Sequence, residues 1–422
     1  MKDIKIFISN FLSRSGSYVF ATTIISRLLS FFASWIALQL IPNKELGVVI
    51  YAFQIIVFII PIGSLGLNQG LLRYGSQLKS NTEKNALFSY ILKKGLFVSL
   101  ILTAIIIVLA YILNFKLKET SLYLILLSTV ITASFVFEII KIQFRLQKNN
   151  KLFSIAELSY NILLVILVFS LSYTFKELGY AISLIFAPLI TSLIFISKLN
   201  IPWKKRVKLS IIDFTFFRYG FFASLSNVTT QLLISIDIIL IGFILKDMEM
   251  VTAFKYISLV PYSLLFLSNV VITTDFVNLT EKISNTTYIK NYIKNYIKLF
   301  SIISAFCILI IYLFGELILS FFQKSYVAYF YSLIILMIGI SGILILRGLF
   351  GNLLSSIGKA YINFVTTTLA LGLNIILNYY FIPKYGILGA AFTSAIIMWF
   401  TGILSFLFFI YFYKKLYFNK VL

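Results

Sequence analysis

Three charged side chains lie inside long apolar runs of the sequence: Arg27, Asp237 and Lys255. A charge at the centre of a hydrocarbon layer costs about 3 kcal/mol on insertion scales, so such a side chain normally faces a cavity or an opposite charge. The two cations could attract an anionic group inside a wet cavity, and the carboxylate could take up a proton. A second interpretation of Lys255 stays open, because a lysine near a helix end can extend its amine to the membrane surface.

Asp237 and Lys255 lie nine residues on either side of position 246, in a turn expected between two apolar runs. In an antiparallel helical hairpin, equal distances from the turn give equal depths, here about 13 Å from its midpoint. We therefore expect the two side chains to form an ion pair. The pair is either a permanent link within the hairpin or a switch, in which an arriving anion takes Lys255 and frees the carboxylate to accept a proton.

Five further charged residues lie at or near the ends of apolar runs, where salt bridges at a gate or at the membrane interface are the ordinary explanation. As candidates for gating or ion coupling we single out Glu138, Glu157, Arg218, Asp275 and Arg347. Glu157 lies one turn further inside its run than the others.

The composition indicates a membrane protein. The chain of 422 residues is 60% hydrophobic and 12% charged, with a mean hydropathy of +1.00, which is outside the range of soluble domains. We therefore expect an all-α polytopic membrane protein. Histidine is absent and Cys307 is the only cysteine, which excludes disulfide frameworks, zinc or haem sites and a Cys/His nucleophile. No catalytic residue, metal site or cofactor is predicted, although coupling of transport to protons or sodium ions stays open.

Twelve apolar runs are close to the 20 residues that a helix needs to cross about 30 Å of hydrocarbon. They cover residues 18–41, 47–72, 91–113, 120–140, 152–174, 178–197, 219–245, 251–277, 299–320, 326–350, 360–382 and 386–412. No small-residue cleavage site follows the first run, so we expect it to be a retained anchor.

Lysine and arginine are unevenly distributed between the two sides of this predicted membrane domain. With the amino terminus inside, 27 of the 36 basic residues fall in cytoplasmic segments and seven in outer ones. The positive-inside rule then places both termini in the cytoplasm. The same bias accounts for most of the formal charge of +22, so the basic residues indicate contact with membrane lipids and not with nucleic acid.

The second half of the sequence repeats the polarity pattern of the first at an offset of about 205 residues. Matched positions include Lys141 with Arg347 at 206, Glu45 with Glu249 at 204, and Leu178-Gly179 with Tyr385-Gly386 at 207. The pattern predicts two parallel six-helix repeats with a central cavity between the lobes. We expect the lobes to span residues 1–200 and 219–422, with a cytoplasmic connecting loop over 201–218.

The clearest local pattern covers residues 352–399, two apolar helices joined by a Pro-Lys-Tyr-Gly corner. Asn374 and Asn378 share one helical face, which in hydrocarbon needs a polar neighbour. Pro383 is expected to stop the first helix, and Gly386 and Gly389 to let the second start close to it.

Two prolines lie in runs that correspond in the two repeats, Pro61 in the second and Pro261 in the eighth. Each removes a helical hydrogen bond and can bend its helix, which would suit alternating access, although membrane helices also tolerate proline without a mechanical role. Before the ninth run, residues 278–298 place tyrosines and lysines on separate faces at a period of four. This stretch is either a helix lying on the membrane surface or the solvated start of the ninth span.

These features resemble the polysaccharide-export branch of the multidrug/oligosaccharidyl-lipid/polysaccharide (MOP) exporter superfamily, which includes O-antigen and capsule repeat-unit flippases. The resemblance rests on the twelve runs, the repeat, the stretch from Asn374 to Ala391 and the Arg-Tyr-Gly that opens the seventh run. The length argues against the peptidoglycan-precursor flippases of this superfamily, which resemble the same plan with two further helices.

The resemblance implies a bacterial inner-membrane flippase, which moves a polyprenyl-pyrophosphate-linked oligosaccharide, as in lipopolysaccharide assembly, and meets other polysaccharide-assembly proteins. In this family, cations on the first and eighth helices line the cavity, and Arg27 and Lys255 match them. Two other classes stay open. A glycan polymerase would need an acid/base pair and a large outer loop, which are not found here. A cation-coupled multidrug exporter would prefer an acidic cavity, whereas the deep charges here are two bases and one acid.

Overall fold

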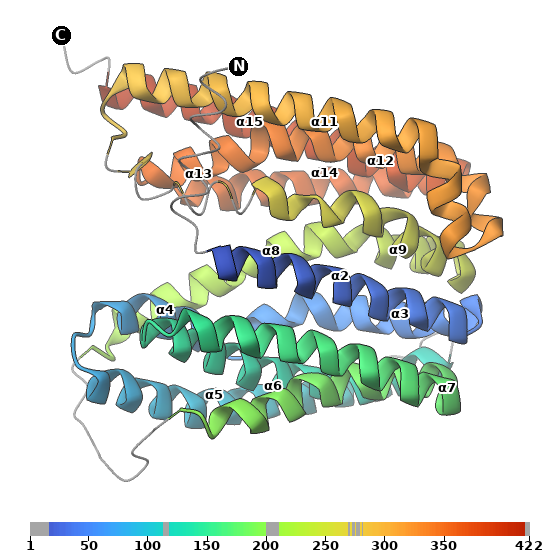
Figure 1. Ribbon diagram of the computed structural model, residues 1–422, viewed down its shortest axis with the longest axis horizontal. Helices are drawn as coiled ribbons and strands as arrows, with labels where there is room; N and C mark the ends of the chain where they lie inside the picture. The colour runs from blue at the N-terminus through green and yellow to red at the C-terminus, as the bar shows by residue number, and fades with distance from the viewer. Residues whose placement is uncertain are drawn as a thin grey trace. The chain divides into compact units, whose positions relative to one another are not determined.

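The chain is described by a computed structural model, which covers residues 17–112, 118–199, 211–268, 271, 275, 279–280 and 282–417. Every regular element within these ranges is a helix (Figure 1). The first half contains α2 (Ser17–Leu40), α3 (Asn43–Ile59), η1 (Ile60–Ile62), α4 (Leu67–Gln77), α5 (Asn81–Ile112), α6 (Lys118–Leu146) and α7 (Asn150–Ile196). The second half contains α8 (Phe214–Leu245), α9 (Met248–Ser263), α11 (Thr286–Phe322), η2 (Lys324–Tyr329), α12 (Phe330–Gly342), η3 (Ile343–Arg347), α13 (Gly348–Ser356), α14 (Tyr361–Tyr385) and α15 (Ile387–Tyr417).

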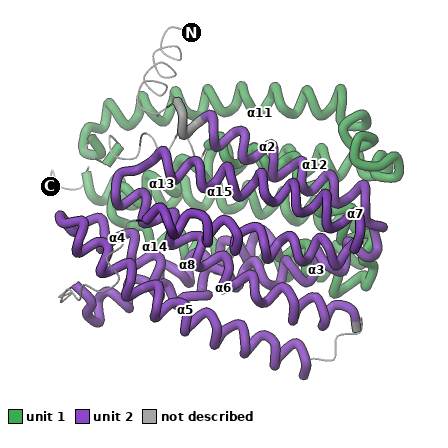
Figure 2. Tube along the Cα trace, turned by 60° about the horizontal axis from the view of Figure 1, so that its bottom comes forward, with its two compact units in different colours: residues 1–17, 236–422 green, residues 18–235 purple. Residues whose placement is uncertain are grey.

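The described residues form two compact units that divide inside α8, between Ser235 and Ile236 (Figure 2). In the unit of residues 18–235, called unit 2 in the figure, α6 is the central helix and packs against α3, α5 and α7. In unit 1, which contains the described residues from Ile236 onward, α15 is central and packs against α12 and α14. The predicted lobe boundaries at residues 200 and 219 stay a prediction.

Eleven helices of the described chain are long and apolar enough to cross a membrane. One of them, α7, has 47 residues and is broken at Lys176, where φ is 50° and ψ is −128°. At 1.5 Å per residue its length is about 70 Å, more than twice the hydrocarbon thickness. Because the break separates the predicted runs 152–174 and 178–197, α7 supplies two crossings, and the twelve predicted runs are accounted for.

The break in α7 and the corner between α14 and α15 have the same geometry. Gly386 adopts φ 56° and ψ −131°, nearly the values of Lys176. A Cβ atom on Gly179 would lie 2.0 Å from the carbonyl oxygen of Leu171, and one on Gly389 would lie 2.3 Å from that of Phe381. Both corners are therefore tight helical hairpins in which a glycine admits the preceding helix.

These equivalent positions correct the predicted repeat register in this region. Lys176 corresponds to Gly386 and Gly179 to Gly389, so the offset here is 210 residues and not 207. The matched segments then read Glu-Leu-Gly-Tyr-Ala and Ile-Leu-Gly-Ala-Ala. The offset grows from 204 near the start of the repeat because connections differ in length while the hairpin geometry is kept.

The sequence pattern predicts that Pro383 stops its helix, but the helix continues past this residue. Pro383 lies inside α14, which continues to Tyr385, and the chain reverses at Gly386. A proline in the last turn removes only one hydrogen bond of the helix, and the amide of Gly386 still donates to the oxygen of Ile382 at 2.8 Å. Gly386 and Gly389 do let α15 start close to α14, as expected.

The span that contains Pro61 is interrupted in its C-terminal half. α3 ends at Ile59, η1 follows, and α4 begins only at Leu67, after Leu65 and Gly66 with positive φ. The hydroxyl of Ser224 on α8 donates to the freed oxygen of Pro61 at 2.7 Å. The helix is therefore interrupted at the predicted proline, and a hinge role for Pro61 stays a prediction. In the corresponding helix α9, Pro261 lies two residues before the end at Ser263.

Gly66 and Gly220 form a close backbone contact at this interruption. A Cβ on Gly66 would lie 1.9 Å from the oxygen of Gly220, and one on Gly220 would lie 2.6 Å from the oxygen of Gly66. We expect Gly66→Ala and Gly220→Ala each to destabilise the folded protein by about 3 kcal/mol, since the helices must separate and Gly66 also has a φ of 80°. Thermal unfolding of the purified protein measures this effect.

The matched control is Gly372→Ala in α14, because a Cβ at Gly372 meets nothing within 4 Å. This substitution should leave the melting temperature unchanged or raise it slightly, as alanine favours a helix. Equal melting temperatures for Gly66→Ala, Gly220→Ala and Gly372→Ala would show that the backbone contact is not formed.

The stretch before the ninth run is part of that span and not a separate helix on the membrane surface. α11 runs without interruption from Thr286 to Phe322. Its tyrosine face is buried, since Tyr292 donates to Asp275 at 3.0 Å and Tyr296 to the oxygen of Leu344 at 3.1 Å. The period-four pattern therefore reflects one face packed in the protein and an exposed lysine face, which is the second of the two interpretations.

Reporter fusions test the predicted topology. Fusions at Lys246, in the turn between α8 and α9, and at Lys384, in the corner between α14 and α15, should report the outside of the membrane. A fusion at Lys290 should report the cytoplasm, and so should one at Lys205, which lies outside the described residues. If Lys246 and Lys290 report the same side, the helix pairing that gives twelve crossings is wrong.

Candidate functional site

Asp237 forms a buried polar cluster with α14 and α15. Its side chain on α8 is only 1% exposed. The amide nitrogens of Asn374 and Asn378 donate to its Oδ1 at 3.0 and 2.6 Å, and the hydroxyl of Ser394 donates to its Oδ2. Asn378 also donates to Asn374 Oδ1 at 2.8 Å. Asp237 is thus the polar neighbour that the asparagine face was expected to need.

The carboxylate of Asp237 is surrounded by neutral groups. Its hydrogen-bond partners are two amides and a hydroxyl, and no ion pair joins it to a cation of the described chain. The Oδ1 atom of Asn378 is buried and accepts no hydrogen bond from the described residues. A buried carboxylate whose partners are all neutral donors is a group that can take up a proton or pair with a small cation.

The expected ion pair between Asp237 and Lys255 is wrong. Within the described chain, Lys255 on α9 forms no salt bridge, and it is half-buried. The two residues do lie equally far from the turn between α8 and α9. Equal depth does not fix the direction of a side chain, however, and the hydrogen bonds of Asp237 go to α14 and α15 and not to Lys255. The roles proposed for Lys255 therefore stay separate from those of Asp237.

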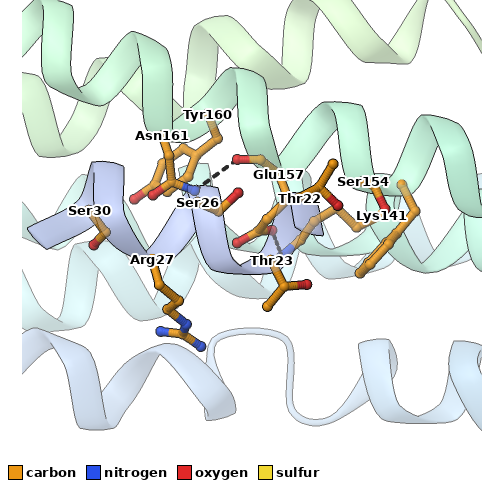
Figure 3. Close-up of a pocket in the computed structure, with 11 residues that line it drawn as sticks. Thr22, Thr23, Ser26, Arg27, Ser30, Lys141, Ser154, Glu157, Tyr160 and Asn161 are labelled. Carbon is orange, nitrogen blue, oxygen red and sulfur yellow. Dashed lines mark hydrogen bonds and ion pairs between the residues drawn. The ribbon is translucent and has the colours of Figure 1, made fainter. Parts of the chain in front are cut away.

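Arg27 lines a polar cavity of about 330 Å³ in unit 2, between α2, α6 and α7. The other lining side chains are mostly hydroxyl, amide or charged groups, among them Ser26, Lys141, Glu157 and Asn161. Figure 3 shows Arg27 extending from α2 away from Asn161. Its guanidinium is exposed and has no carboxylate partner among the described residues. It is therefore accessible to an anion that enters the cavity.

Lys141 joins two of the predicted acidic residues. Its Nζ lies 2.8 Å from Glu138 and 2.9 Å from Glu157, and its side chain is 14% exposed. Figure 3 shows the contact with Glu157. Lys141 and Glu157 lie eight residues on either side of position 149, in the turn between α6 and α7. Equal distance from the turn, which wrongly predicts an ion pair between Asp237 and Lys255, correctly pairs Lys141 with Glu157. The salt bridges that were the ordinary explanation for Glu138 and Glu157 are thus present.

The repeat places Arg347 where Lys141 lies in the first half, but its partners are neutral. Arg347 belongs to η3, a π-helical turn between α12 and α13. Its guanidinium donates to Asn363 Oδ1 at 3.2 Å, Ser405 Oγ at 2.7 Å and Thr367 Oγ1 at 3.1 Å. At the offset of 206 that joins Lys141 to Arg347, Glu157 corresponds to Asn363. In unit 2 the cation Lys141 therefore has two carboxylate partners. In unit 1 the partners of the cation Arg347 are amide and hydroxyl groups.

The remaining predicted residues are more scattered. Arg218 is exposed near the start of α8, and Asp275 accepts the hydroxyl of Tyr292. Sequence reasoning missed Ser394 and the pairing of Lys141. Ser394 has no local signal, since it lies 157 residues from Asp237 and looks like any serine of an apolar helix.

The chain matches a known protein family and several solved structures. Residues 12–277 match the sequence model of a family described as polysaccharide biosynthesis protein. A comparison with curated protein sequences returned no significant match.

Three of the similar structures are membrane transporters. An inward-facing multidrug resistance MATE family transporter of the MOP superfamily has 16% identity and a TM-score of 0.69 over 94% of this chain and 98% of that one. The lipid II flippase MurJ in an inward closed conformation has 21% identity and a TM-score of 0.69 over 94% and 87%. A MOP superfamily transporter from Pyrococcus furiosus, described by the reverse polarity of its binding pocket, has 15% identity and a TM-score of 0.60 over 96% of both chains.

These likenesses establish the fold. The prediction of an all-α polytopic membrane protein with a MATE-like, MOP-type fold is confirmed, and the chain is a multi-pass membrane protein. Because the TM-scores with the drug transporter and with the lipid flippase are equal, the fold does not separate these two functions.

Proposed function

Because the chain belongs to the polysaccharide biosynthesis protein family, we propose that it is a flippase that moves a polyprenyl-pyrophosphate-linked oligosaccharide from the inner to the outer leaflet of a bacterial cytoplasmic membrane. The observation that carries this proposal is the polar cavity that Arg27 lines within a lobe of membrane-spanning helices. In this proposal the protein is a transporter and not an enzyme, both termini are cytoplasmic, and the glycan belongs to an O-antigen, capsule or exopolysaccharide.

The charges of the cavity suit such a cargo. The pyrophosphate is anionic, the sugars are polar and the polyprenyl tail can stay in lipid, so only the head needs a wet path. An accessible guanidinium can bind a phosphate oxygen through charge-assisted hydrogen bonds. Lys141 is less available to an anion, because two carboxylates already hold its ammonium group. Arg27 is therefore the residue that we assign to the pyrophosphate.

We further propose that Asp237 couples transport to an ion gradient. A lone carboxylate at this depth is costly, so it should carry a proton or hold a sodium ion for much of the transport cycle. Asn374 and Asn378 on α14 and Ser394 on α15 hold the carboxylate between two helices of one hairpin. A change in its charge alters three hydrogen bonds at once and so favours one arrangement of α8 against this hairpin.

A cation-coupled multidrug exporter is the second candidate, and the buried carboxylate of Asp237 is compatible with it. The exposed cation at Arg27 disfavours it, since cationic drugs would be repelled from that cavity. Gene context separates the two: neighbouring genes for sugar-nucleotide synthesis and glycosyl transfer would favour the flippase.

A depletion experiment tests the proposed function. In a strain depleted of this protein, lipid-linked repeat units should accumulate and the surface glycan should disappear, because the cargo is made on the inner leaflet and used on the outer one. A surface glycan that persists at its normal level, with no accumulation of repeat units, would contradict the flippase assignment.

A further inference from the structure

A second polar cavity, of about 300 Å³, lies in unit 2 next to the interrupted span. It is lined by the chain around Pro61, by α6 and by α8, with side chains that include Ser64, Asn68, Phe135, Glu138, Asn227 and Gln231. Glu138 and Asn227 are exposed although both lie in spanning helices. Polar side chains exposed at this depth would be costly against lipid, so they face a wet cavity.

The interrupted backbone between α3 and α4 lines this cavity. Irregular backbone within a membrane is tolerated only where it is buried in protein or lines a water-filled space. Here the carboxamide oxygen of Asn68 accepts the amide of Gln69 at 2.9 Å and the hydroxyl of Ser64 at 3.3 Å. The oxygen of Asn68 therefore accepts two local hydrogen bonds in the first turn of α4, and its amide nitrogen, which has no hydrogen bond within the described chain, remains as a donor.

One face of α8 completes the cavity. Gly220, Ser224, Asn227 and Gln231 recur at intervals of four, three and four residues, so they share a helical face. Gly220 and Ser224 contact the interrupted span, and the two carboxamides continue this face into the cavity. Neither Asn227 nor Gln231 has a hydrogen bond to another described residue. The same face of α8 thus contacts the interrupted backbone between α3 and α4 and directs two unpaired carboxamides into the cavity.

Charge and size indicate the kind of ligand. No lysine or arginine is among the lining residues, and the one charged group is Glu138, so the cavity has no cation of its own to bind an anion. The volume is about ten times the roughly 30 Å³ that a water molecule occupies in the liquid, which is too large for a site that holds a single ion. Carboxamides present a donor and an acceptor in one plane, which matches adjacent hydroxyl groups of a sugar, and Phe135 offers a ring to its apolar face.

The two cavities are linked through Lys141. Glu138 lines the second cavity, which we call the carboxamide cavity after Asn68, Asn227 and Gln231. Glu157 lines the cavity with Arg27, and the ammonium of Lys141 bonds to both carboxylates. We propose that the carboxamide cavity binds the sugar residues of the cargo through Asn68, Asn227 and Gln231 while Arg27 holds its pyrophosphate. This proposal rests on the proposed function, since the sugar and the pyrophosphate must be parts of one molecule.

Protection of engineered cysteines tests this assignment. In a Cys307→Ser background that still supports glycan export, Gln231→Cys reports on the carboxamide cavity and Thr23→Cys on the cavity with Arg27. The rate of maleimide labelling is measured in membranes with two probes: lipid-linked repeat units extracted from a depleted strain, and undecaprenyl pyrophosphate without sugars. At ten times its dissociation constant, a bound probe should slow labelling about tenfold.

We expect the sugar-bearing lipid to protect both positions and the sugar-free lipid to protect only Thr23→Cys. Equal protection of Gln231→Cys by both lipids would overturn the sugar assignment, and so would protection of Thr23→Cys alone by the sugar-bearing lipid. If neither lipid protects either position, the proposed function fails and this inference fails with it.

Alanine substitutions give a second readout that does not depend on cysteines. Asn227→Ala and Gln231→Ala should each weaken binding of the sugar-bearing lipid about tenfold, since a hydroxyl loses its partner, and leave binding of undecaprenyl pyrophosphate unchanged. The matched control is Thr229→Ala on the same helix, because Thr229 bonds to the oxygen of Ser226 within α8 and does not line the cavity. Equal losses for both lipids would show that the carboxamides only support the fold.

Discussion

Asp237→Asn should insert and fold normally and yet reduce glycan export at least about tenfold. Asparagine has nearly the size of aspartate and keeps one carbonyl oxygen to accept from Asn374 and Asn378, so the cluster at α14 stays largely bonded. It cannot take up a proton or pair with a cation, so the charge change that we assign to the transport cycle is lost. Surface glycan per unit of protein in the membrane measures this effect.

Asp247→Asn provides the control for that experiment. Asp247 caps the start of α9 by accepting the amides of Glu249 and Met250, and asparagine caps helices about as well as aspartate. Export should therefore stay normal. If Asp237→Asn exports glycan at the normal rate, Asp237 is a structural residue and the ion-coupling proposal is wrong.

Arg27→Ala should also abolish most of the export, with normal amounts of protein in the membrane. The substitution removes the exposed cation of the cavity without breaking an ion pair of the described chain, so the loss should appear in transport and not in stability. Charge-assisted hydrogen bonds contribute about 1.5–3 kcal/mol, which corresponds to a decrease of roughly ten- to a hundredfold.

Arg27→Lys distinguishes a need for charge from a need for shape. It should retain part of the export, because an ammonium still attracts a phosphate but cannot bind it with two parallel hydrogen bonds. Lys94→Ala, at an exposed lysine of α5 outside the cavity, should have no effect. An Arg27→Ala variant with normal export would remove this residue from the mechanism.

The fold could be predicted from the sequence to a large extent, because membrane helices leave a simple signal. Apolar length gave the spans and the spacing of matched residues gave the repeat. The errors were local. The offset of 207 at Gly179 was wrong because Leu178-Gly179 can be matched with Tyr385-Gly386 or with Leu388-Gly389, and only the hairpin geometry shows that Gly179 corresponds to Gly389. Pro383 was misread because a proline in a last turn costs little.

The candidate site was harder to predict, because the direction of a side chain depends on tertiary packing. The asparagine face of α14 correctly required a polar neighbour, but nothing in the sequence identified Asp237, 137 residues away, as that neighbour. Equal depth in a hairpin is necessary for a pair and not sufficient. It holds for Lys141 and Glu157, which form a salt bridge, and for Asp237 and Lys255, which do not.

The difference between the repeats was also hidden in the sequence. Lys141 and Arg347 match in position and charge, yet the first has two carboxylate partners and the second has Asn363, Thr367 and Ser405. The substitution of an asparagine for a glutamate at the matched position 363 leaves the cation of unit 1 without a countercharge among the described residues. Matched spacing therefore predicts where a residue lies and not which charge surrounds it.

Sidedness of the lipid-linked oligosaccharide tests the proposed transport most directly. The purified protein is reconstituted into liposomes that contain repeat units extracted from a depleted strain, and a membrane-impermeant sugar oxidase is added outside. With the protein present, nearly all repeat units should become accessible to the oxidase. With Arg27→Ala, the rise above the fraction that starts in the outer leaflet should be roughly ten- to a hundredfold slower. If the accessible fraction is the same with and without the protein, under an imposed proton or sodium gradient, the chain does not move this cargo.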